Sequence, residues 1–353
     1  MKTPLVSIII VNFNGKLLLK NCISSILKND YFNYEIIIVD NCSTDGSEYL
    51  IKKNFTPHLS KIKFIKLTKN FGPSYARNMG FRQSQGKFLA FLDNDTEVDK
   101  FFITKAIKLF DTDTKIGAIQ CKLLLLDNKK HLDYAGELLG NLGFLRSIAK
   151  YQELDRGQYD QNNQILSAKS AGMLIRRVAF IDAGMFDPDY FIFMEETDLG
   201  WRTLLVGYKN IFCPESVVYH KFSSTRDIVD PDFNNYLVRF HGTKNYIQTH
   251  IKNLSSKYLL KILPIHIFLW FCLATYLLLT GKFKSAKNIY KGIFWNFTHL
   301  KQTLKKRKII QKNRKLSDTE IFINQGLMSK TKLSYYLKNF FSTQKHMVTP
   351  ENN

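Results

Sequence analysis

Two aspartates separated by one residue are the first feature of the chain that can support chemistry. Asp93 and Asp95 flank Asn94 directly after the apolar run FLAFL. Carboxylate oxygens at positions i and i+2 of a loop after a strand are hard ligands, suited to Mg²⁺ or Mn²⁺ that also binds a diphosphate. An isolated pair of this kind is more often a solvated turn, so its meaning depends on the residues that lie beside it.

A second acidic pair and a histidine are candidates for neighbours of these aspartates. Glu195 and Glu196 precede a helical stretch that runs to Val206. One of them can act as a general base that removes a proton from an attacking hydroxyl. The alternative is that they are the acidic first turn that a helix favours. His220 ends the strand-like SVVYH, where an imidazole that faces Asp93 and Asp95 would complete a metal site.

Two further side chains are predicted to contact a nucleotide. Asp40 ends the apolar run EIIIV, where a carboxylate can accept a hydrogen bond from a base or from a ribose hydroxyl. Arg77 lies in a helical stretch beside the same region, and either contacts a phosphate or is a surface arginine.

Alternating strands and helices are needed to position these side chains. The apolar run at 5–11, helical spacing at 16–29 and the apolar run at 35–40 form a strand, a helix and a strand, and the pattern continues to a strand ending near Asp93. This order predicts an α/β fold with a mostly parallel sheet. Ligands of such sheets bind outside the carboxyl ends of the strands, so Asn12, Asp40 and Asp93 to Asp95 should converge on one crevice.

The C-terminal part differs in charge and hydropathy. The chain carries a net charge of +21, and residues 251–353 hold 19 Lys and Arg against 3 Asp and Glu. Residues 262–281 contain no formal charge, and this segment is long enough to cross a bilayer as a helix. A single crossing would place the basic tail on the outer side, against the positive-inside tendency. A helix in the plane of an anionic membrane surface is therefore favoured over a spanning helix or a buried core helix.

The order and spacing of several motifs resemble a family 2 glycosyltransferase. These motifs are VSIIIVNFNG, IIIVDNCSTDGS, NFGPSYARNMG, FLDNDTEVD, SAGMLIRR and FDPDYFIFMEETDLGWR, and the segment ending at His220 follows them. Residues 5–225 are similar to the bacterial rhamnosyltransferase-like branch of that family, and the segment after them is similar to the branch's membrane-associated tail. The resemblance implies the A-type nucleotide-diphospho-sugar transferase fold, which is Rossmann-like, and three regions. These are a catalytic domain at 1–225, a helical membrane-associated segment at 226–310 and a basic tail at 311–353.

The resemblance also implies an inverting, metal-dependent transfer of a sugar from a nucleotide diphosphate. Asn12, Asp40, Arg77 and Asp93 would bind the donor, and Asp93, Asp95 and His220 would bind Mg²⁺ or Mn²⁺. Many relatives have Glu followed by Asp where this chain has Glu195 and Glu196, so we expect Glu196 to be the base and Glu195 its substitute. The rhamnose of dTDP-rhamnose is the first expectation for the donor sugar, and a UDP-hexose is the second.

A lipid-linked saccharide acceptor at the cytoplasmic face of a bacterial inner membrane would fit the basic, apolar C-terminal part, with a monotopic or peripheral attachment.

Two other classes of protein stay open. A nucleotidyltransferase would have a glycine-rich phosphate loop, for which NFNGK is a poor match. A membrane-anchored binding module for nucleic acid would have a basic folded body, whereas residues 1–250 carry a net charge of only +5. We therefore expect no nucleic-acid partner.

Overall fold

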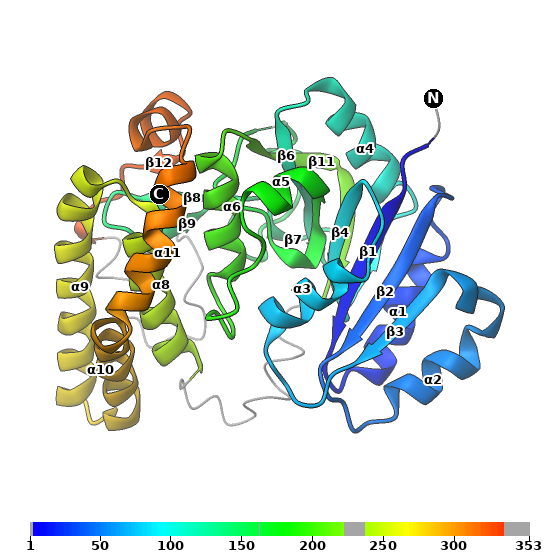
Figure 1. Cartoon of the computed structure of the whole chain (residues 1–353), viewed down its shortest axis with the longest axis horizontal. Helices are drawn as coiled ribbons and strands as arrows, with labels where there is room; N and C mark the ends of the chain where they lie inside the picture. The colour runs from blue at the N-terminus through cyan, green and yellow to red at the C-terminus, as the bar shows by residue number, and fades with distance from the viewer. Residues whose placement is uncertain (1–2, 162, 222–236, 335–353) are drawn as a thin grey trace.

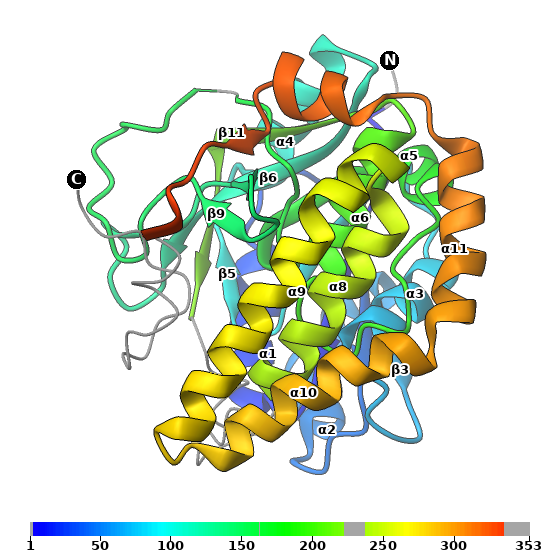
Figure 2. The same cartoon turned by 90° about the vertical axis from the view of Figure 1, so that its left-hand side faces the viewer.

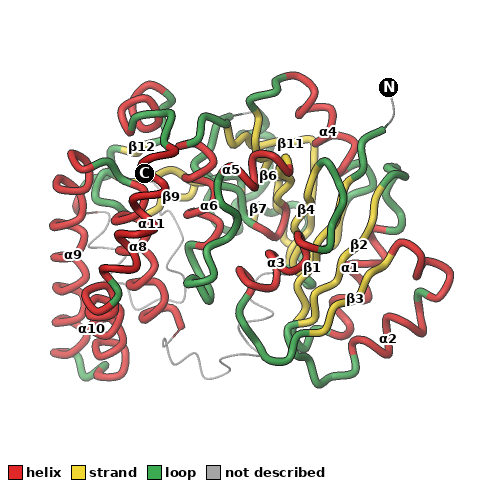
Figure 3. Tube along the Cα trace, viewed as in Figure 1, coloured by secondary structure: helices red, strands yellow, loops and turns green. Residues whose placement is uncertain are grey.

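A mixed β-sheet with helices on both faces forms the centre of the protein, and a layer of C-terminal helices lies along one side of it (Figures 1 and 3). The computed structural model describes residues 3–161, 163–221 and 237–334. The predicted α/β class is confirmed. Residues 222–236 and 335–353, which include parts of the expected helical segment and basic tail, lie outside the described residues.

The N-terminal half supplies a parallel block of four strands in the order β3-β2-β1-β4. Their bounds are β1 Val6–Asn12, β2 Tyr34–Asp40, β3 Ile62–Lys66 and β4 Phe88–Asp93. In register, Asn12 pairs with Asp40 and Val11 with Asp93. The carboxyl ends of the three central strands therefore lie at one edge of the sheet, as the sequence predicts.

The second half of the sheet is mixed. β10 runs antiparallel between β4 and β6, and β11 runs parallel to β6. At the edges, β5 pairs antiparallel with β11 and β7 pairs antiparallel with β6. The strands are β5 Thr96–Val98, β6 Ile116–Leu125, β7 Leu132–Tyr134, β10 Met173–Arg176 and β11 Lys209–His220. The pairing of β5 with β11 sets His220 opposite Thr96 and so brings the end of β11 to the loop after β4.

Helices cover both faces of the sheet because the buried strands carry apolar side chains on both sides. One apolar cluster includes Ile8, Leu19 and Phe102, and the other includes Ile9, Phe91 and Phe180. The helices are α1 Lys16–Ile26, α2 Ser47–Asn54, α3 Pro73–Arg82, α4 Phe102–Thr112, α5 Arg177–Asp182 and α6 Glu195–Leu205.

The C-terminal helices pack against the part of the chain that carries the sheet instead of forming a separate body. They are α8 Gly242–Asn253, α9 Ser256–Leu279, α10 Phe283–Thr298 and α11 Leu300–Asn313. α8 contacts α6, and one apolar cluster contains Trp201 of α6, Ile262 of α9 and Phe322. The short strand β12, Met328–Ser329, pairs with β8, Glu137–Gly140, which also pairs with β9, Leu145–Ser147. The boundaries predicted at 225 and 310 stay a prediction, but the described residues on either side share a core.

Candidate active site

Three side chains at the carboxyl edge of the sheet form a cluster that can hold a metal ion. One ligand atom from each of Asp93, Asp95 and His220 lies within 4.8 Å of the others. Asp95 is 5% exposed, and its Oδ1 accepts no hydrogen bond among the described residues. His220 Nε2 lies 3.5 Å from this oxygen. Two carboxylates and an imidazole are a donor set that fits Mn²⁺ or Mg²⁺, and a buried oxygen without a hydrogen bond is what a cation would satisfy.

Asp133 of β7 fixes the orientation of the His220 ring. Its Oδ2 lies 2.7 Å from His220 Nδ1, and the Asp133 side chain is 6% exposed. Burial acts to lower the pKa of His220, but Asp95 and Asp133 outweigh it and raise this pKa well above its ordinary value. The carboxylate on Nδ1 holds the ring with Nε2 facing Asp95, and metal-binding histidines are usually oriented in this way.

Arg77 of α3 connects the metal cluster to the glutamate pair. Its Nη2 donates to Asp93 Oδ1 at 3.0 Å, and its Nη1 donates to Glu195 Oε1 at 3.1 Å. The guanidinium is buried, so it is not a surface arginine. Both of these partners are carboxylates, and the predicted contact of Arg77 with a donor phosphate stays a prediction. In this position Arg77 compensates the negative charge that gathers around the metal cluster.

The two glutamates at the start of α6 have different surroundings. Burial raises the pKa of Glu195 to about 7, and the adjacent Glu196 adds to this rise. Burial also acts to raise the pKa of Glu196, but Lys169, Arg77 and hydrogen bonds from Ser170 hold it below its ordinary value. Ser170 Oγ donates to Glu196 Oε1 at 2.7 Å. Glu196 is therefore ionised at neutral pH, as a general base must be.

A left-handed turn presents the glutamate pair, and α8 supports that turn. Phe193 and Met194, directly before α6, have φ of 65° and 68°. Such a conformation is strained in residues other than glycine and persists only where the surroundings hold it. Asn245 of α8 donates from Nδ2 to the carbonyl oxygens of Ile192 at 2.8 Å and Phe193 at 2.7 Å. A helix of the C-terminal layer thus holds the backbone that carries Glu195 and Glu196.

Ion pairs tie α8 and α11 to α6 and to the loop that precedes it. Lys252 of α8 is 1% exposed, and its Nζ lies 2.6 Å from Asp187 Oδ2 and 3.0 Å from Asp198 Oδ2. Lys306 of α11 lies 2.5 Å from Asp187 and Asp189. Asp198 of α6 also pairs with Arg202 in the next turn, so it connects α8 to α6.

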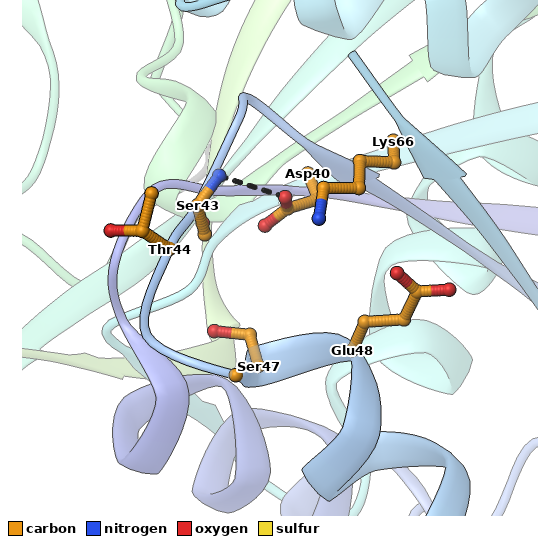
Figure 4. Close-up of a pocket in the computed structure, with 7 residues that line it drawn as sticks. Asp40, Ser43, Thr44, Ser47, Glu48 and Lys66 are labelled. Atoms are coloured by element: carbon orange, nitrogen blue, oxygen red, sulfur yellow. Dashed lines mark hydrogen bonds between the residues drawn. The ribbon is translucent and has the colours of Figure 1, made fainter. Parts of the chain in front are cut away.

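A pocket of about 190 Å³ opens at the end of β2 (Figure 4). It is lined by Asp40, Ser43, Thr44, Gly46, Ser47, Glu48 and Lys66. Asn12 Nδ2 donates to Asp40 Oδ1 at 2.8 Å, and the Ser43 N–H donates to Asp40 Oδ2 at 2.9 Å. Asn94 Nδ2 donates to Asn12 Oδ1 at 2.8 Å. These bonds join the pocket to the loop that carries Asp93 and Asp95.

The structure brings every predicted site residue to this edge of the sheet. Asn12, Asp40, Asp93, Asp95 and His220 converge as expected, and Arg77 links them to Glu195 and Glu196. Their assigned roles stay predictions.

Four residues of the site were not predicted: Asp133, Lys169, Ser170 and Asn245. Ser170 lies within the quoted motif SAGMLIRR, and Asp133 is an acidic residue between Leu132 and Tyr134 of a strand, so both carried a weak signal. Asn245 carried none.

Comparison with known proteins adds to this description of the fold and the site. Residues 7–180 match the family model described as Glycosyl transferase family 2. The match covers just under half of the chain and agrees with the resemblance of its motifs to that family. The rhamnosyltransferase-like branch is a finer assignment that the match does not make.

Two relatives show how much of the chain is shared. The Putative teichuronic acid biosynthesis glycosyltransferase TuaG of Bacillus subtilis is 32% identical over 105 residues, which are 30% of this chain and 41% of TuaG. The UDP-Glc:alpha-D-GlcNAc-diphosphoundecaprenol beta-1,3-glucosyltransferase WfgD of Escherichia coli is 24% identical over 274 residues, which are 73% of this chain and 98% of WfgD. The matched stretches cover less than half of the first curated relatives, TuaG among them.

A solved structure supports the fold. The mannosyltransferase PcManGT from Pyrobaculum calidifontis, in complex with GDP-Man and Mn²⁺, superposes with a TM-score of 0.53 at 15% identity, over 89% of this chain and 86% of that one. The fold is therefore the A-type nucleotide-diphospho-sugar transferase fold, as expected.

Proposed function

We propose that this protein is an inverting, metal-dependent glycosyltransferase that moves a sugar from a nucleotide diphosphate to a hydroxyl of a lipid-linked saccharide during assembly of a bacterial surface polysaccharide. The observation that carries the proposal is that one arginine, Arg77, joins two sets of carboxylates, one that can hold a metal ion and one that can supply a base. Arg77 Nη2 lies 3.0 Å from the candidate metal ligand Asp93 and 4.0 Å from Glu196, and Arg77 Nη1 lies 3.1 Å from Glu195. Such a transfer needs a cation at the leaving diphosphate and a base at the attacking hydroxyl.

The pocket at Asp40 is the proposed seat of the nucleotide. Asp40 is held by Asn12 and Ser43, so its carboxylate is fixed before a donor arrives. A fixed acceptor of hydrogen bonds suits a base or ribose hydroxyl. WfgD is named for a UDP-sugar, whereas PcManGT was solved with GDP-Man, so the identity of the base is left to experiment. Rhamnose from dTDP-rhamnose remains our first choice, and a UDP-hexose the second.

Asp93, Asp95 and His220 would hold Mg²⁺ or Mn²⁺, which when bound neutralises charge on the departing diphosphate. Arg77 limits the repulsion between Asp93 and the glutamates, because it donates to both sides. Glu196 accepts the proton of the acceptor hydroxyl, and Ser170 orients the carboxylate for this step. Attack from the face opposite the diphosphate inverts the anomeric carbon.

The acceptor is proposed from the C-terminal helices. The name of WfgD includes a diphosphoundecaprenol-linked sugar, and α9 is long and apolar enough to cross a membrane by length and composition. An enzyme at the cytoplasmic face of the bacterial inner membrane, attached as a monotopic or peripheral protein, would share one surface with such an acceptor.

A thermal-shift and calorimetric screen tests the donor half of this proposal. Purified protein is titrated with UDP-, dTDP- and GDP-sugars in the presence of Mn²⁺, Mg²⁺ or EDTA. A ligand at 100 times its Kd stabilises the folded state by about 2.7 kcal/mol, so one donor should raise Tm, and EDTA should remove the rise.

The control pair for this screen is Asp95→Asn against Asp99→Asn. Asp95→Asn should abolish the metal-dependent part of the shift, whereas Asp99→Asn, at a residue outside the metal cluster, should retain it. A folded protein that gives no shift with any nucleotide sugar would contradict the proposed function and favour a non-enzymatic role.

A further inference from the structure

The outward side of α9 is mainly apolar, with exposed lysines only near its start, at Lys257 and Lys261. Its exposed apolar side chains recur at helical spacing and are Leu260, Ile265, Phe268, Phe271, Leu278 and Leu279. No residue between Lys261 and Lys282 carries a formal charge. A helix at the surface of a water-soluble protein normally shows charged or polar residues on its outer side. An exposed apolar stripe of this length marks a surface that contacts something apolar.

α10 extends this surface with alternating aromatic and basic side chains. Phe283, Phe294 and Phe297 are each more than 60% exposed, and Lys284, Lys287 and Lys291 are exposed beside them. Figure 2 shows α9 and α10 together on the side that faces the viewer. We call the exposed side chains of α9 and α10 named here the docking face. Aromatic residues interleaved with lysines are typical of helices that lie at the boundary between headgroups and acyl chains.

The inner side of α9 shows how it can be oriented. Leu269, Trp270 and Leu273 are buried in an apolar cluster with α8 and α10. α8 is in turn fixed to the catalytic half by Lys252 and Asn245. A spanning α9 would have to leave this cluster and expose its partners on α8. Only one side of α9 is therefore available, which requires the helix to lie along a surface.

Charge selects the occupant of the docking face. Within the described residues from 251 onward, Asp318 and Glu320 are the only acidic residues, and neither is in α9 or α10. A second copy of the chain packed symmetrically on this face would bring lysines against lysines. Anionic phospholipid headgroups complement them, and each lysine near such a surface adds roughly 1 kcal/mol, or about fivefold in affinity.

We propose that the docking face seats the protein on an anionic phospholipid bilayer, with α9 lying in the plane of the interface and the aromatic side chains of α9 and α10 inserted between the headgroups. This inference rests on the proposed function, because it gives the membrane-borne acceptor a surface on which to meet the enzyme.

Cosedimentation of the full chain with vesicles tests the proposal. We expect binding to phosphatidylglycerol/phosphatidylcholine vesicles and much weaker binding to phosphatidylcholine alone. The double variant Phe268→Glu/Phe271→Glu should lose at least about tenfold in affinity, because two apolar side chains no longer leave water. The matched control is Phe32→Glu/Phe101→Glu, which changes two phenylalanines of similar exposure away from α9 and should bind as the parent does.

A second pair of variants tests the charge. Lys284→Gln/Lys287→Gln/Lys291→Gln should lose about 100-fold on anionic vesicles, since three lysines each contribute about fivefold. It should change little on neutral vesicles. Lys52→Gln/Lys53→Gln/Lys63→Gln, at exposed lysines on the opposite half of the chain, is its control. Equal losses in both triple variants would mean that net charge, and not this face, drives binding, and would overturn the proposal.

The orientation of α9 is tested by the depth of tryptophans placed along it. Phe268→Trp and Leu279→Trp should both be quenched best by lipids brominated at shallow acyl positions, relative to the parent protein. In a spanning helix position 268 would lie near the bilayer centre and would be quenched best by lipids brominated at deep acyl positions, which would refute the in-plane orientation. Light scattering without lipid gives a further test, because a dimer that Phe268→Glu dissociates would make a second copy the occupant.

The vesicle and donor experiments fail separately. If a nucleotide sugar raises Tm and the chain ignores all vesicles, the docking face and the membrane attachment are wrong and the proposed sugar transfer from a nucleotide diphosphate stands. If the chain binds anionic vesicles through this face and no nucleotide sugar binds, the proposed function is wrong.

Discussion

Replacing Asn245 with alanine should lower turnover without removing a group that touches substrate. Asn245 lies on α8, fully buried, and donates two hydrogen bonds to the carbonyl oxygens that precede the catalytic helix. Without the amide, those buried oxygens lose their donor and the left-handed turn at Phe193 and Met194 loses its support. The turn should then relax and move Glu196 away from the acceptor.

The magnitude follows from these contacts. Two neutral hydrogen bonds contribute about 1 kcal/mol each, and a buried acceptor left unsatisfied costs about 1–3 kcal/mol. We therefore expect Asn245→Ala to destabilise the protein by roughly 2–4 kcal/mol. A displacement of about 1 Å at a catalytic group can cost on the order of 100-fold in rate, so kcat should fall by about that factor while the donor KM changes little.

Asn296 provides a matched control. It is also buried, and its Nδ2 also donates to two backbone carbonyls, those of Lys244 at 3.1 Å and Gly292 at 3.0 Å, but it does not touch the turn. Urea unfolding and steady-state kinetics are measured on both alanine variants. Similar losses of stability with a fall in kcat for Asn245→Ala alone would support the assignment. An unchanged kcat in a folded Asn245→Ala protein would refute the claim that α8 positions the catalytic turn.

Three other experiments address the rest of the site. If Glu196 is the base, kcat/KM should stay nearly constant as the pH falls from 7 to 6, because the pKa of Glu196 lies below its ordinary value. If Glu195, whose pKa is about 7, is the base instead, kcat/KM should fall by nearly tenfold per pH unit below 7. Glu196→Gln should lose 100-fold or more at every pH. Asp133→Asn should weaken Mn²⁺ binding by about 10- to 100-fold, measured by electron paramagnetic resonance without substrate, because the His220 ring loses its orienting carboxylate; unchanged affinity would make Asp133 merely structural. Lys252→Met should destabilise the fold by about 1.5–3 kcal/mol in urea unfolding, since Asp187 and Asp198 each lose a charged hydrogen-bond donor while Lys306 and Arg202 remain, and a loss under about 1 kcal/mol would contradict the importance of Lys252.

The sequence predicts the first half of the site well because strand ends are easy to locate. Apolar runs of five to seven residues mark β1, β2 and β4, and in a parallel sheet their carboxyl ends meet at one edge. Asn12, Asp40 and Asp93 follow from this geometry alone. His220 was also found this way, although the pairing of β11 with β5 that brings it to Asp95 could not be read from the pattern.

What the sequence does not predict depends on helix faces and on contacts between distant segments. The pattern around Arg77 predicts a helix, but not that the guanidinium points inward at Asp93 and Glu195. Asp133 lies in a three-residue strand inside a region without clear periodicity. Asn245 contacts a turn about fifty residues earlier in the chain, and α8 buries polar residues on all its sides, so no amphipathic pattern reveals its partner.

Because Lys252 is buried, the reactivity of its amine reports how tightly α8 packs against α6. A lysine whose ammonium lies between Asp187 and Asp198 is closed to acylating reagents, whereas Lys257 and Lys261, a short way along the chain, are open to them. Labelling at position 252 therefore measures how often α8 separates from the catalytic helix. Since the docking face on α9 and α10 packs against α8, the labelling rate would show whether attachment to a lipid surface tightens or loosens the contact of α8 with α6, which begins with Glu195 and Glu196.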